Sequence, residues 1–251
     1  MEDLLIVRGL MKSFEALMAV HDVDFTLPKN EIRAIIGPNG AGKTTFFNLL
    51  TGHLSPTRGK IVFQGEDITG LSPAKISHKG ISRSFQITNI FPNFSALENI
   101  QIAVQSRNRF QYPFRHVSRL KAEREKAERI LESIGLKDMA EGLAPNLSHG
   151  DQRHLEIGIA LATDPVLLLL DEPTAGMSPA ETTATAKLIK KIAREEGLTI
   201  IIVEHDMGVV MEVADTISVF HQGCIIAEGS PEAIRKDEKV QEAYLKGTPL
   251  C

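Results

Sequence analysis

The fold is decided by the stretch Gly37-Pro38-Asn39-Gly40-Ala41-Gly42-Lys43-Thr44 (GPNGAGKT), which directly follows an apolar run at residues 32–36. It fits the pattern GxxxxGK[ST], in which glycines let the backbone turn so that its N–H groups face inward. Lys43 adds a positive charge, and the hydroxyl of Thr44 is a suitable Mg²⁺ ligand. A helix that begins near Lys43 directs its positive dipole end toward the same anion. Strand, loop and helix in succession therefore predict a site for nucleotide phosphates.

Composition indicates an ordinary globular protein. With 251 residues, of which 43% are hydrophobic, the chain can form one large domain or a core with a smaller subdomain. A net charge of −4 argues against broad attraction to nucleic acid or anionic lipid. Two cysteines, Cys224 and Cys251, are too few for a disulfide framework and are typical of a reducing compartment. Because signal-peptide and membrane-spanning patterns are absent from the sequence, we expect a cytoplasmic chain.

The N-terminal part has the pattern of strands. Residues 22–27 alternate polar and apolar, which predicts a strand with one buried face and an antiparallel sheet. Residues 59–65 (GKIVFQG) predict another such strand, and Phe14 is placed in the loop between the first two strands.

From about residue 85 to residue 158 the apolar spacing becomes helical, which predicts a helical subdomain. Within it the run at residues 107–116 (RNRFQYPFRH) is basic with interleaved aromatics. Such a run is compatible with nucleic-acid contact, but a proline-interrupted surface loop is the favoured interpretation. One charged helix presents an apolar face made of Leu120, Ala127, Ile130, Leu131 and Ile134.

Two short, uniformly apolar runs, at residues 166–170 and 198–203, predict parallel strands covered by helices on both faces. Residues 179–196 between them open with a proline and continue with helical spacing, so a right-handed crossover is expected. Residues 217–228 predict a hairpin that turns at Gln222-Gly223, followed by a short helical tail.

An acidic pair, Asp171-Glu172, follows the first of these apolar runs. The carboxyl end of a buried parallel strand is where such sheets bind ligands. Asp171 is therefore a candidate to hold Mg²⁺, and Glu172 to orient or deprotonate water. The alternative is an acidic pair that only caps the next turn, and the phosphate loop upstream makes this the weaker interpretation.

Together these residues resemble the nucleotide-binding subunit of an ATP-binding cassette (ABC) transporter, and the resemblance covers nearly the whole chain. GPNGAGKT is similar to the Walker A motif, and VLLLLDEPT at residues 166–174 is similar to Walker B with its catalytic glutamate. Residues 147–151 (LSHGD) lie where the LSGGQ signature belongs. The resemblance implies ATP and Mg²⁺ as cofactors. It implies nucleotide contacts from Gly37, Pro38, Asn39, Gly40, Ala41, Gly42, Lys43, Thr44, Thr45, Ser148, Gly150 and Asp171.

The same resemblance gives roles to three isolated residues. Gln86 matches the Q-loop glutamine, so Thr44, Gln86 and Asp171 are the implied metal-site residues. His205 matches the switch histidine, which with Glu172 makes the implied catalytic pair, and Phe14 matches the aromatic residue that stacks on adenine. Taken singly, Gln86 could be an ordinary loop residue, Phe14 a core aromatic and His205 a helix cap.

The chain departs from the family pattern at three positions. His149 replaces a glycine and Asp151 the glutamine of the signature, and Ser178 replaces the aspartate of the D-loop. Ser148 and Gly150 still offer a hydroxyl and a backbone N–H at the start of a helix expected over residues 152–162. These departures leave a non-hydrolysing regulatory subunit as an alternative.

Within the family, the segment ISRSFQ at residues 81–86, the polar insertion at 107–119 and the ending Ala243-Tyr244-Leu245 most resemble the LivG-type subfamily, which imports branched-chain amino acids. Urea or amide importers are an alternative. So is a soluble ABC-type ATPase that acts on nucleic acid or ribosomes, although the chain lacks the second cassette, coiled-coil insert or basic extension typical of that class.

We therefore expect an α/β P-loop NTPase with a mostly parallel core sheet, an antiparallel β subdomain and a helical insert. Residues 1–85 and 165–240 are assigned to the catalytic core, 86–160 to the insert and 241–251 to a C-terminal tail. The implied partners are transmembrane permease subunits, a second ABC ATPase in a homodimer or heterodimer, and indirectly a substrate-binding protein, with no nucleic acid. The implied location is the cytoplasmic face of the membrane.

The loop at residues 87–94 (ITNIFPNF) is a candidate for the contact with a permease. It carries Phe91 and Phe94, and exposed apolar residues in a turn indicate a protein interface. The alternative is that these aromatics pack the insert's own core, which we expect for at least one of them.

Overall fold

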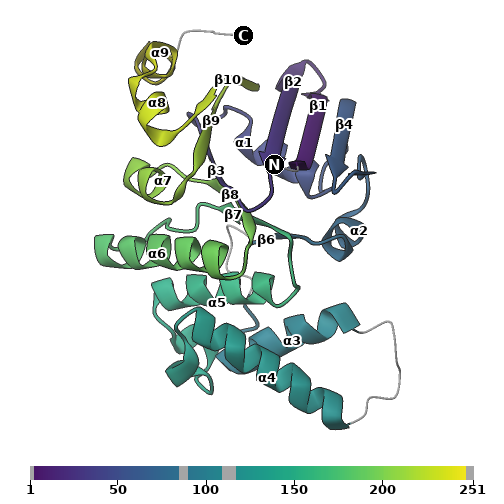
Figure 1. Cartoon of the computed structure of the whole chain (residues 1–251), viewed down its shortest axis with the longest axis vertical. Coiled ribbons are helices and arrows are strands. Elements are labelled where there is room, and N and C mark those ends of the chain that lie inside the picture. Colours follow the sequence, from purple (N-terminus) through teal and green to yellow (C-terminus); the bar gives the residue numbers. More distant parts are fainter. Residues whose placement is uncertain (1–2, 85–89, 109–116, 247–251) are drawn as a thin grey trace.

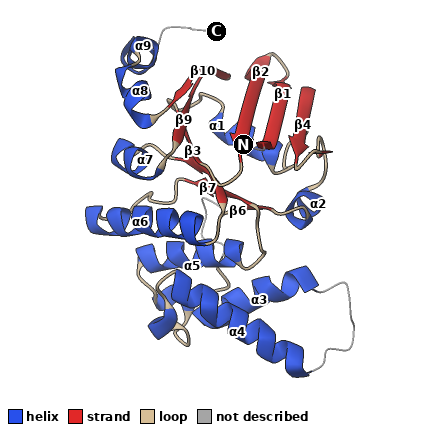
Figure 2. Cartoon of the chain, in the orientation of Figure 1, coloured by secondary structure: helices blue, strands red, loops and turns tan. Residues whose placement is uncertain are grey.

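The computed structural model describes residues 3–84, 90–108 and 117–246 (Figure 1). Its strands form two sheets, one with the order β2-β1-β4-β5 and one with the order β10-β9-β3-β8-β7-β6. Helices cover the larger sheet, and the helices α3 to α6 lie to one side of it (Figure 2). The expected α/β class is confirmed.

The smaller sheet is antiparallel throughout. The predicted alternation is confirmed along its second strand, where Val23, Phe25 and Leu27 are buried. Two predicted boundaries are wrong. Phe14 is the last residue of a strand and does not lie in a loop, and the strand expected over residues 59–65 ends earlier because two residues with positive φ turn the chain. The strands are β1 (Asp3–Phe14), β2 (Leu17–Pro28), β4 (Arg58–Phe63) and β5 (Glu66–Asp67).

The larger sheet is parallel except for the final hairpin, in which β9 and β10 are antiparallel. The hairpin turns at Gln222-Gly223 as predicted. The strands are β3 (Ile32–Ile36), β6 (Ile81–Arg83), β7 (Leu167–Asp171), β8 (Thr199–Val203), β9 (Thr216–His221) and β10 (Cys224–Gly229).

Most helices follow the predicted segments, with small differences at their ends, but the short helices at Pro73–His78 and Met207–Val213 were not predicted. They are α1 (Lys43–Leu50), α2 (Pro73–His78), α3 (Ala96–Asn108), α4 (Val117–Ser133), α5 (His149–Leu161), α6 (Pro179–Glu195), α7 (Met207–Val213), α8 (Pro231–Lys236) and α9 (Glu238–Lys246), with short 3₁₀ turns at Lys137–Met139 and Ala144–Asn146.

The helix predicted over residues 152–162 begins three residues earlier, at His149. Ser148 is its N-cap, and its hydroxyl accepts a hydrogen bond from the Asp151 amide, which satisfies one of the free N–H groups of the first turn. The signature segment is therefore helical from its third residue.

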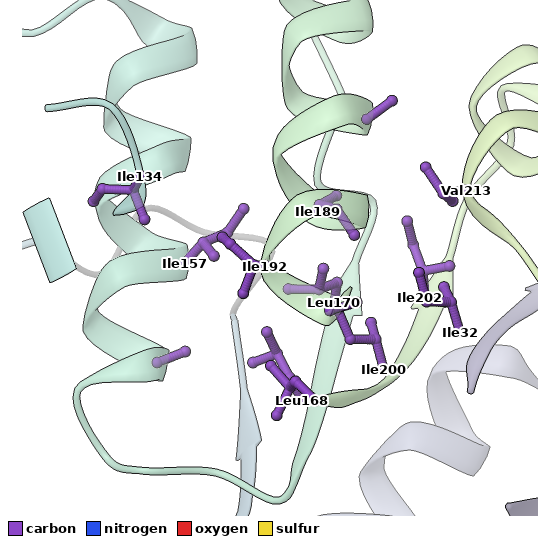
Figure 3. Packing of buried hydrophobic residues seen from close by; sticks show 14 of the residues in the cluster. Ile32, Ile134, Ile157, Leu168, Leu170, Ile189, Ile192, Ile200, Ile202 and Val213 are labelled. Carbon is purple, nitrogen blue, oxygen red and sulfur yellow. The ribbon is translucent and has the colours of Figure 1, made fainter. Parts of the chain in front are cut away.

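Both faces of the parallel strands are covered, as their uniform apolar character predicts. Alternate residues of β7 and β8 point to opposite faces. Leu168 and Leu170 pack toward α5 and α6, and Ile202 lies beside Val213 of α7, in one buried cluster (Figure 3). Leu169 and Ile201 pack toward α1 and the antiparallel sheet in a second cluster. Each fully buried side chain of this kind contributes about 1.5–3 kcal/mol, so the two clusters hold the ends of β3, β7 and β8 firmly at one edge.

The signature helix α5 lies between α6 and the pair formed by α3 and α4 (Figure 1). On α4 the described members of the predicted apolar face are buried at Ala127 and Leu131 and partly buried at Ile130. Within the basic run at residues 107–116, residues 107–108 end α3, and the rest lies outside the described residues.

The expectation that Phe91 or Phe94 packs into the core is wrong. Phe91 is 46% exposed and Phe94 is 40% exposed. Their rings lie edge to face with centroids 6.0 Å apart, so they contact each other at the surface. Over the described residues, no helix combines the length and apolar character needed to cross a membrane.

Candidate functional site

Steric constraints hold the phosphate loop in shape. Gly37 has φ of 152°, and a Cβ there would lie 2.1 Å from the Phe220 carbonyl oxygen. Gly42 has φ of 102°, and its Cβ would lie 2.4 Å from the Ala19 carbonyl oxygen. Both positions therefore require glycine, because a side chain would strike the backbone of β9 or β2. The loop is closed between the two sheets.

Lys43, the first residue of α1, folds its side chain back over this loop. Its Nζ donates to the carbonyl oxygens of Gly37 at 2.6 Å and Pro38 at 3.0 Å. Burial lowers the pKa of the ammonium, and the negative charges of Glu172 and Asp171 oppose that shift. A buried cation thus stands at the centre of the loop, next to two carboxylates.

A pocket of about 460 Å³ opens beside the loop. Phe14, at the end of β1, is 41% exposed at its rim, and Lys12 Nζ lies 5.0 Å from the centre of its ring. Glu172 and His205 enter from the ends of β7 and β8. The phosphate-loop residues that line the pocket are Asn39, Gly40, Ala41, Gly42, Lys43, Thr44 and Thr45.

Glu172 and His205 are in direct contact. His205 Nε2 lies 2.8 Å from Glu172 Oε1, so the carboxylate accepts a hydrogen bond from the imidazole. Glu172 also has φ of 48°, a left-handed conformation that costs an ordinary residue free energy. Its N–H donates to the Val203 carbonyl at 2.9 Å, which helps to hold that conformation. A carboxylate paired with histidine beside a buried lysine can accept a proton from water.

Glu204, which the sequence analysis did not select, braces this pair. Its carboxylate is buried and accepts from the amide and the hydroxyl of Thr174, at 3.0 and 2.6 Å, and from the His205 amide at 3.1 Å. It therefore ties the loop after Glu172 to the loop that carries His205. Its position directly after a buried apolar strand is the same signal that identified Asp171, and could have found it.

Asp171 lies behind the pocket and does not line it. Its Oδ2 accepts from Arg83 NH2 at 2.6 Å, and Arg83 NH1 donates to Asn48 Oδ1 at 2.6 Å. Arg83 was also not selected from the sequence. An arginine in a short strand whose other two residues are buried needs a partner for its charge, but the segment Ile81-Ser82-Arg83 is too short and too polar to show this burial in the sequence.

The signature residues lie apart from this pocket, since neither Ser148 nor Gly150 lines it. The Ser148 hydroxyl donates to Asp151 Oδ2 at 2.7 Å. Within this chain the hydroxyl that the resemblance assigns to a phosphate contact therefore already donates its proton to a carboxylate. His149 Nε2 lies 3.2 Å from the Ala175 carbonyl oxygen. Within one chain the structure therefore brings together only one part of the implied nucleotide site.

One further contact joins α5 to the catalytic segment, and one local motif starts α6. Arg153 pairs with Glu156 at 2.6 Å and donates to the Glu172 carbonyl at 3.3 Å. Ser178, the departure at the D-loop, is the N-cap of α6 and forms a capping box with Glu181. Gln86 lies outside the described residues.

Comparison with known proteins agrees with this geometry. The family described as "ABC transporter" matches residues 20–175, and the family described as "Branched-chain amino acid ATP-binding cassette transporter" matches residues 224–245. The "High-affinity branched-chain amino acid transport ATP-binding protein LivG" of Escherichia coli (strain K12) is 41% identical over 250 residues, covering 97% of this chain and 98% of that relative. BraF of Pseudomonas aeruginosa, with the same printed description, is 41% identical over 248 residues, covering 96% of this chain and 97% of that relative.

Among solved structures, the ADP conformation of an ATP-binding cassette of an ABC transporter aligns with a TM-score of 0.86 and 31% identity, covering 98% of this chain and all of the other. The likeness therefore extends over the sheets and helices as well as over the motifs. A family match over residues 20–175 and 41% identity over 97% of the chain show that this protein belongs to the ABC transporter family and is one of its nucleotide-binding ATPases.

Proposed function

We propose that the chain hydrolyses ATP with Mg²⁺ and powers the import of branched-chain amino acids. The observation that carries the chemical part is the contact between Glu172 and His205 beside the buried Lys43 in one pocket. In this proposal the phosphate loop and Lys43 bind the phosphates, and Phe14 stacks on adenine.

The donor set fits Mg²⁺. Thr44 is exposed at the first turn of α1 and offers a hydroxyl, and Asp171 offers a carboxylate. Among residues 3–84, 90–108 and 117–246 no group of three or more histidine, cysteine, aspartate or glutamate side chains could hold a metal. Mg²⁺ does not need such a group, because it is typically bound by one or two protein oxygens together with substrate phosphates and water. Bound there, Mg²⁺ would neutralise charge on the phosphates, with Gln86 as the third proposed contact.

The protein residues supply the proton chemistry. Glu172 accepts a proton from the attacking water, and the hydrogen bond from His205 holds its carboxylate toward the pocket. His205, 44% exposed at its side chain, can instead donate to a phosphate oxygen. The test is Glu172→Gln in the full chain with its assembly partners, which should bind ATP and lose hydrolysis. Parental hydrolysis by this variant would contradict the assignment.

Branched-chain amino acids are proposed as the cargo because LivG and BraF carry that description and residues 224–245 match a family of the same kind. Substrate selection would reside in the permease and substrate-binding subunits. The experiment is to purify the complex from membranes, reconstitute it in vesicles and measure ATP-driven uptake of radiolabelled leucine and of urea. Uptake of urea without leucine would replace the proposed cargo.

A groove of about 360 Å³ between the catalytic sheet and α5 is the proposed docking place for a permease segment on the cytoplasmic face of the membrane. Its lining is mainly apolar and includes Ile76, Ile81 and Ile159. The exposed pair Phe91 and Phe94 adds apolar surface to the segment that precedes α3. Such a surface is typical of a protein interface.

The docking proposal is tested by co-purification with the membrane subunits. Phe91→Asp and Phe94→Asp should reduce co-purification and leave ATP affinity unchanged, since the phosphate loop is untouched. Met207→Asp is the matched control, because Met207 is also exposed, at 39%, but begins α7 and does not line the groove. Unchanged docking of both phenylalanine variants would remove this pair from the interface.

A second cassette is proposed to complete the ATP site, because Ser148 and Gly150 do not line the pocket of their own chain. The partner is either a second copy or a related ATPase. Light scattering of Glu172→Gln with ATP, alone and with candidate partners, should show an ATP-dependent dimer. Monomers in every mixture would contradict this arrangement.

A further inference from the structure

Arg83 links three elements behind the phosphate loop. It ends the edge strand β6, donates to the side chain of Asp171 at the end of β7, and donates to Asn48 on α1. Its guanidinium also lies over the ring of Phe47, 5.6 Å from the centre. The side chain is 10% exposed and that of Asp171 is 4% exposed, so their contact is a nearly buried ion pair. Arginine suits this place because its rigid fork can bind two acceptors at once.

Asp171 interacts with two cations. Burial lowers the pKa of Lys43, and the negative charges of Glu172 and Asp171 oppose that shift. Arg83 binds the Asp171 carboxylate through Oδ2, the oxygen that the hydrogen bond between these two described residues uses. A carboxylate held by one oxygen keeps the other for a further ligand, and carboxylates that bind metals are regularly oriented by such outer partners.

We propose that Arg83 is a positioning residue, which orients the Asp171 carboxylate for Mg²⁺. It donates to Oδ2 of Asp171 from the end of β6, and its second hydrogen bond, to Asn48 on α1, fixes the guanidinium in place. This inference rests on the proposed assignment of Asp171 to the metal. Arg83 also lines the groove of about 360 Å³, beside Glu156 and His53. The proposed metal site and the groove therefore share one side chain. Burial lowers the pKa of His53, and the nearby charge of Arg83 lowers it further.

The test measures metal affinity directly. Mn²⁺, a paramagnetic substitute for Mg²⁺, is titrated into the full chain with ATP, and free Mn²⁺ is followed by electron paramagnetic resonance. Arg83→Met should weaken Mn²⁺ binding by about 10–100-fold, the usual effect of losing an outer-shell partner. Its affinity for ATP in EDTA should be unchanged, because the phosphate loop is intact. Arg83→Lys keeps the charge without the fork and should give a smaller loss.

Arg33→Met is the matched control for damage to the fold. Arg33 is as deeply buried, with 7% of its side chain exposed, and forms ion pairs with Glu31 and Glu228 away from the pocket. Both methionine variants should melt at lower temperature, but only Arg83→Met should change the Mn²⁺ titration. Equal losses of Mn²⁺ affinity in both variants, or tighter Mn²⁺ binding by Arg83→Met, would overturn the inference.

Asp171→Asn separates the inference from the assignment on which it rests. If this variant binds Mn²⁺ with ATP as tightly as the parent, Asp171 is not the metal residue and the proposed site itself is wrong. If it binds Mn²⁺ weakly while Arg83→Met and Arg83→Lys bind normally, the site stands and only the positioning role of Arg83 is lost.

Discussion

The phosphate loop at residues 37–45 and the signature segment at residues 147–151 both lead into the first turn of a helix, but different forces hold them. Backbone contacts confine the loop, since side chains at Gly37 or Gly42 would strike β9 or β2. Polar side chains confine the signature, where Ser148 bonds to Asp151. The three atoms nearest to a Cβ at Gly150 all belong to the flexible side chain of Glu181, the closest at 3.1 Å. The comparison teaches that the loop is fixed before any ligand arrives, whereas the signature contacts can exchange for new ones.

The largest effect, on ATP hydrolysis, is expected from Glu172, which lies in the same pocket as the phosphate loop. Glu172→Gln should lower hydrolysis by roughly 10²–10⁴, the usual contribution of a positioned general base, while ATP still binds. Lys43→Ala should instead weaken ATP binding, because it removes the buried cation from the loop. Steady-state hydrolysis with the assembled partners and equilibrium binding of ATP measure the two effects. A Glu172→Gln variant that fails to bind ATP would show that the glutamate has a structural role.

A matched pair of glycine substitutions tests the comparison itself. Gly37→Ala should destabilise the chain by about 2–5 kcal/mol, since its Cβ must displace the backbone of β9. Gly150→Ala should change stability by less than about 1 kcal/mol, because the Glu181 side chain can move aside. Urea unfolding of both variants gives the values. Equal losses would mean that the signature is as rigid as the loop.

The capping box that supports the signature side should have a moderate effect. Ser178→Ala removes the N-cap of α6 and should lower stability by about 0.5–2 kcal/mol. Glu181 would then lose the hydrogen bond from the Ser178 hydroxyl and keep the one from the Ser178 amide, so its carboxylate beside Gly150 would be held less tightly. Thermal unfolding measures the loss, and Ser178→Asp, which restores a cap and the usual D-loop residue, should recover it. No recovery would indicate that a specific serine contact matters.

The smallest effect is expected at Asp151. Asp151→Asn removes a negative charge from the first turn of α5 and should cost about 0.3–1 kcal/mol of stability. The same change frees Ser148 from a charged acceptor and removes repulsion toward phosphate, so the ATP-dependent dimer should become tighter. Light scattering in the Glu172→Gln background compares the two forms. A weaker dimer would mean that the carboxylate helps to shape the signature.

The sequence predicts the loop side well because its geometry depends on local patterns. Glycines at Gly37 and Gly42, an apolar strand before them and acidic residues after a buried strand are visible within a few positions. The start of α5 was predicted three residues late, because Ser148 was read as a phosphate contact and its capping role was overlooked. Phe91 and Phe94 were harder to place, since aromatic residues in a loop indicate either a core or a surface contact.

The bracing residues could not be assigned from the sequence, because their roles depend on distant partners. Arg83 meets Asp171 across 88 positions, Thr174 meets Glu204 across 30, and Arg153 reaches the Glu172 carbonyl across 19. Arg83, Glu204 and Arg153 are charged residues inside or next to a buried element. The pattern indicates that a partner must exist, but only the packed strands show which one.

The left-handed backbone of Glu172 lowers the stability of the fold, whereas the proposed catalysis needs the carboxylate at this position. Glycine adopts φ near 48° without penalty, and alanine does not, so Glu172→Gly should melt at a higher temperature than Glu172→Ala although both lack the carboxylate. The residue that fits this backbone without strain therefore lacks the carboxylate that the proposed catalysis needs. A variant of this ATPase engineered for a higher melting temperature should therefore keep Glu172, and its stabilising substitutions should lie away from the carboxyl ends of the parallel strands.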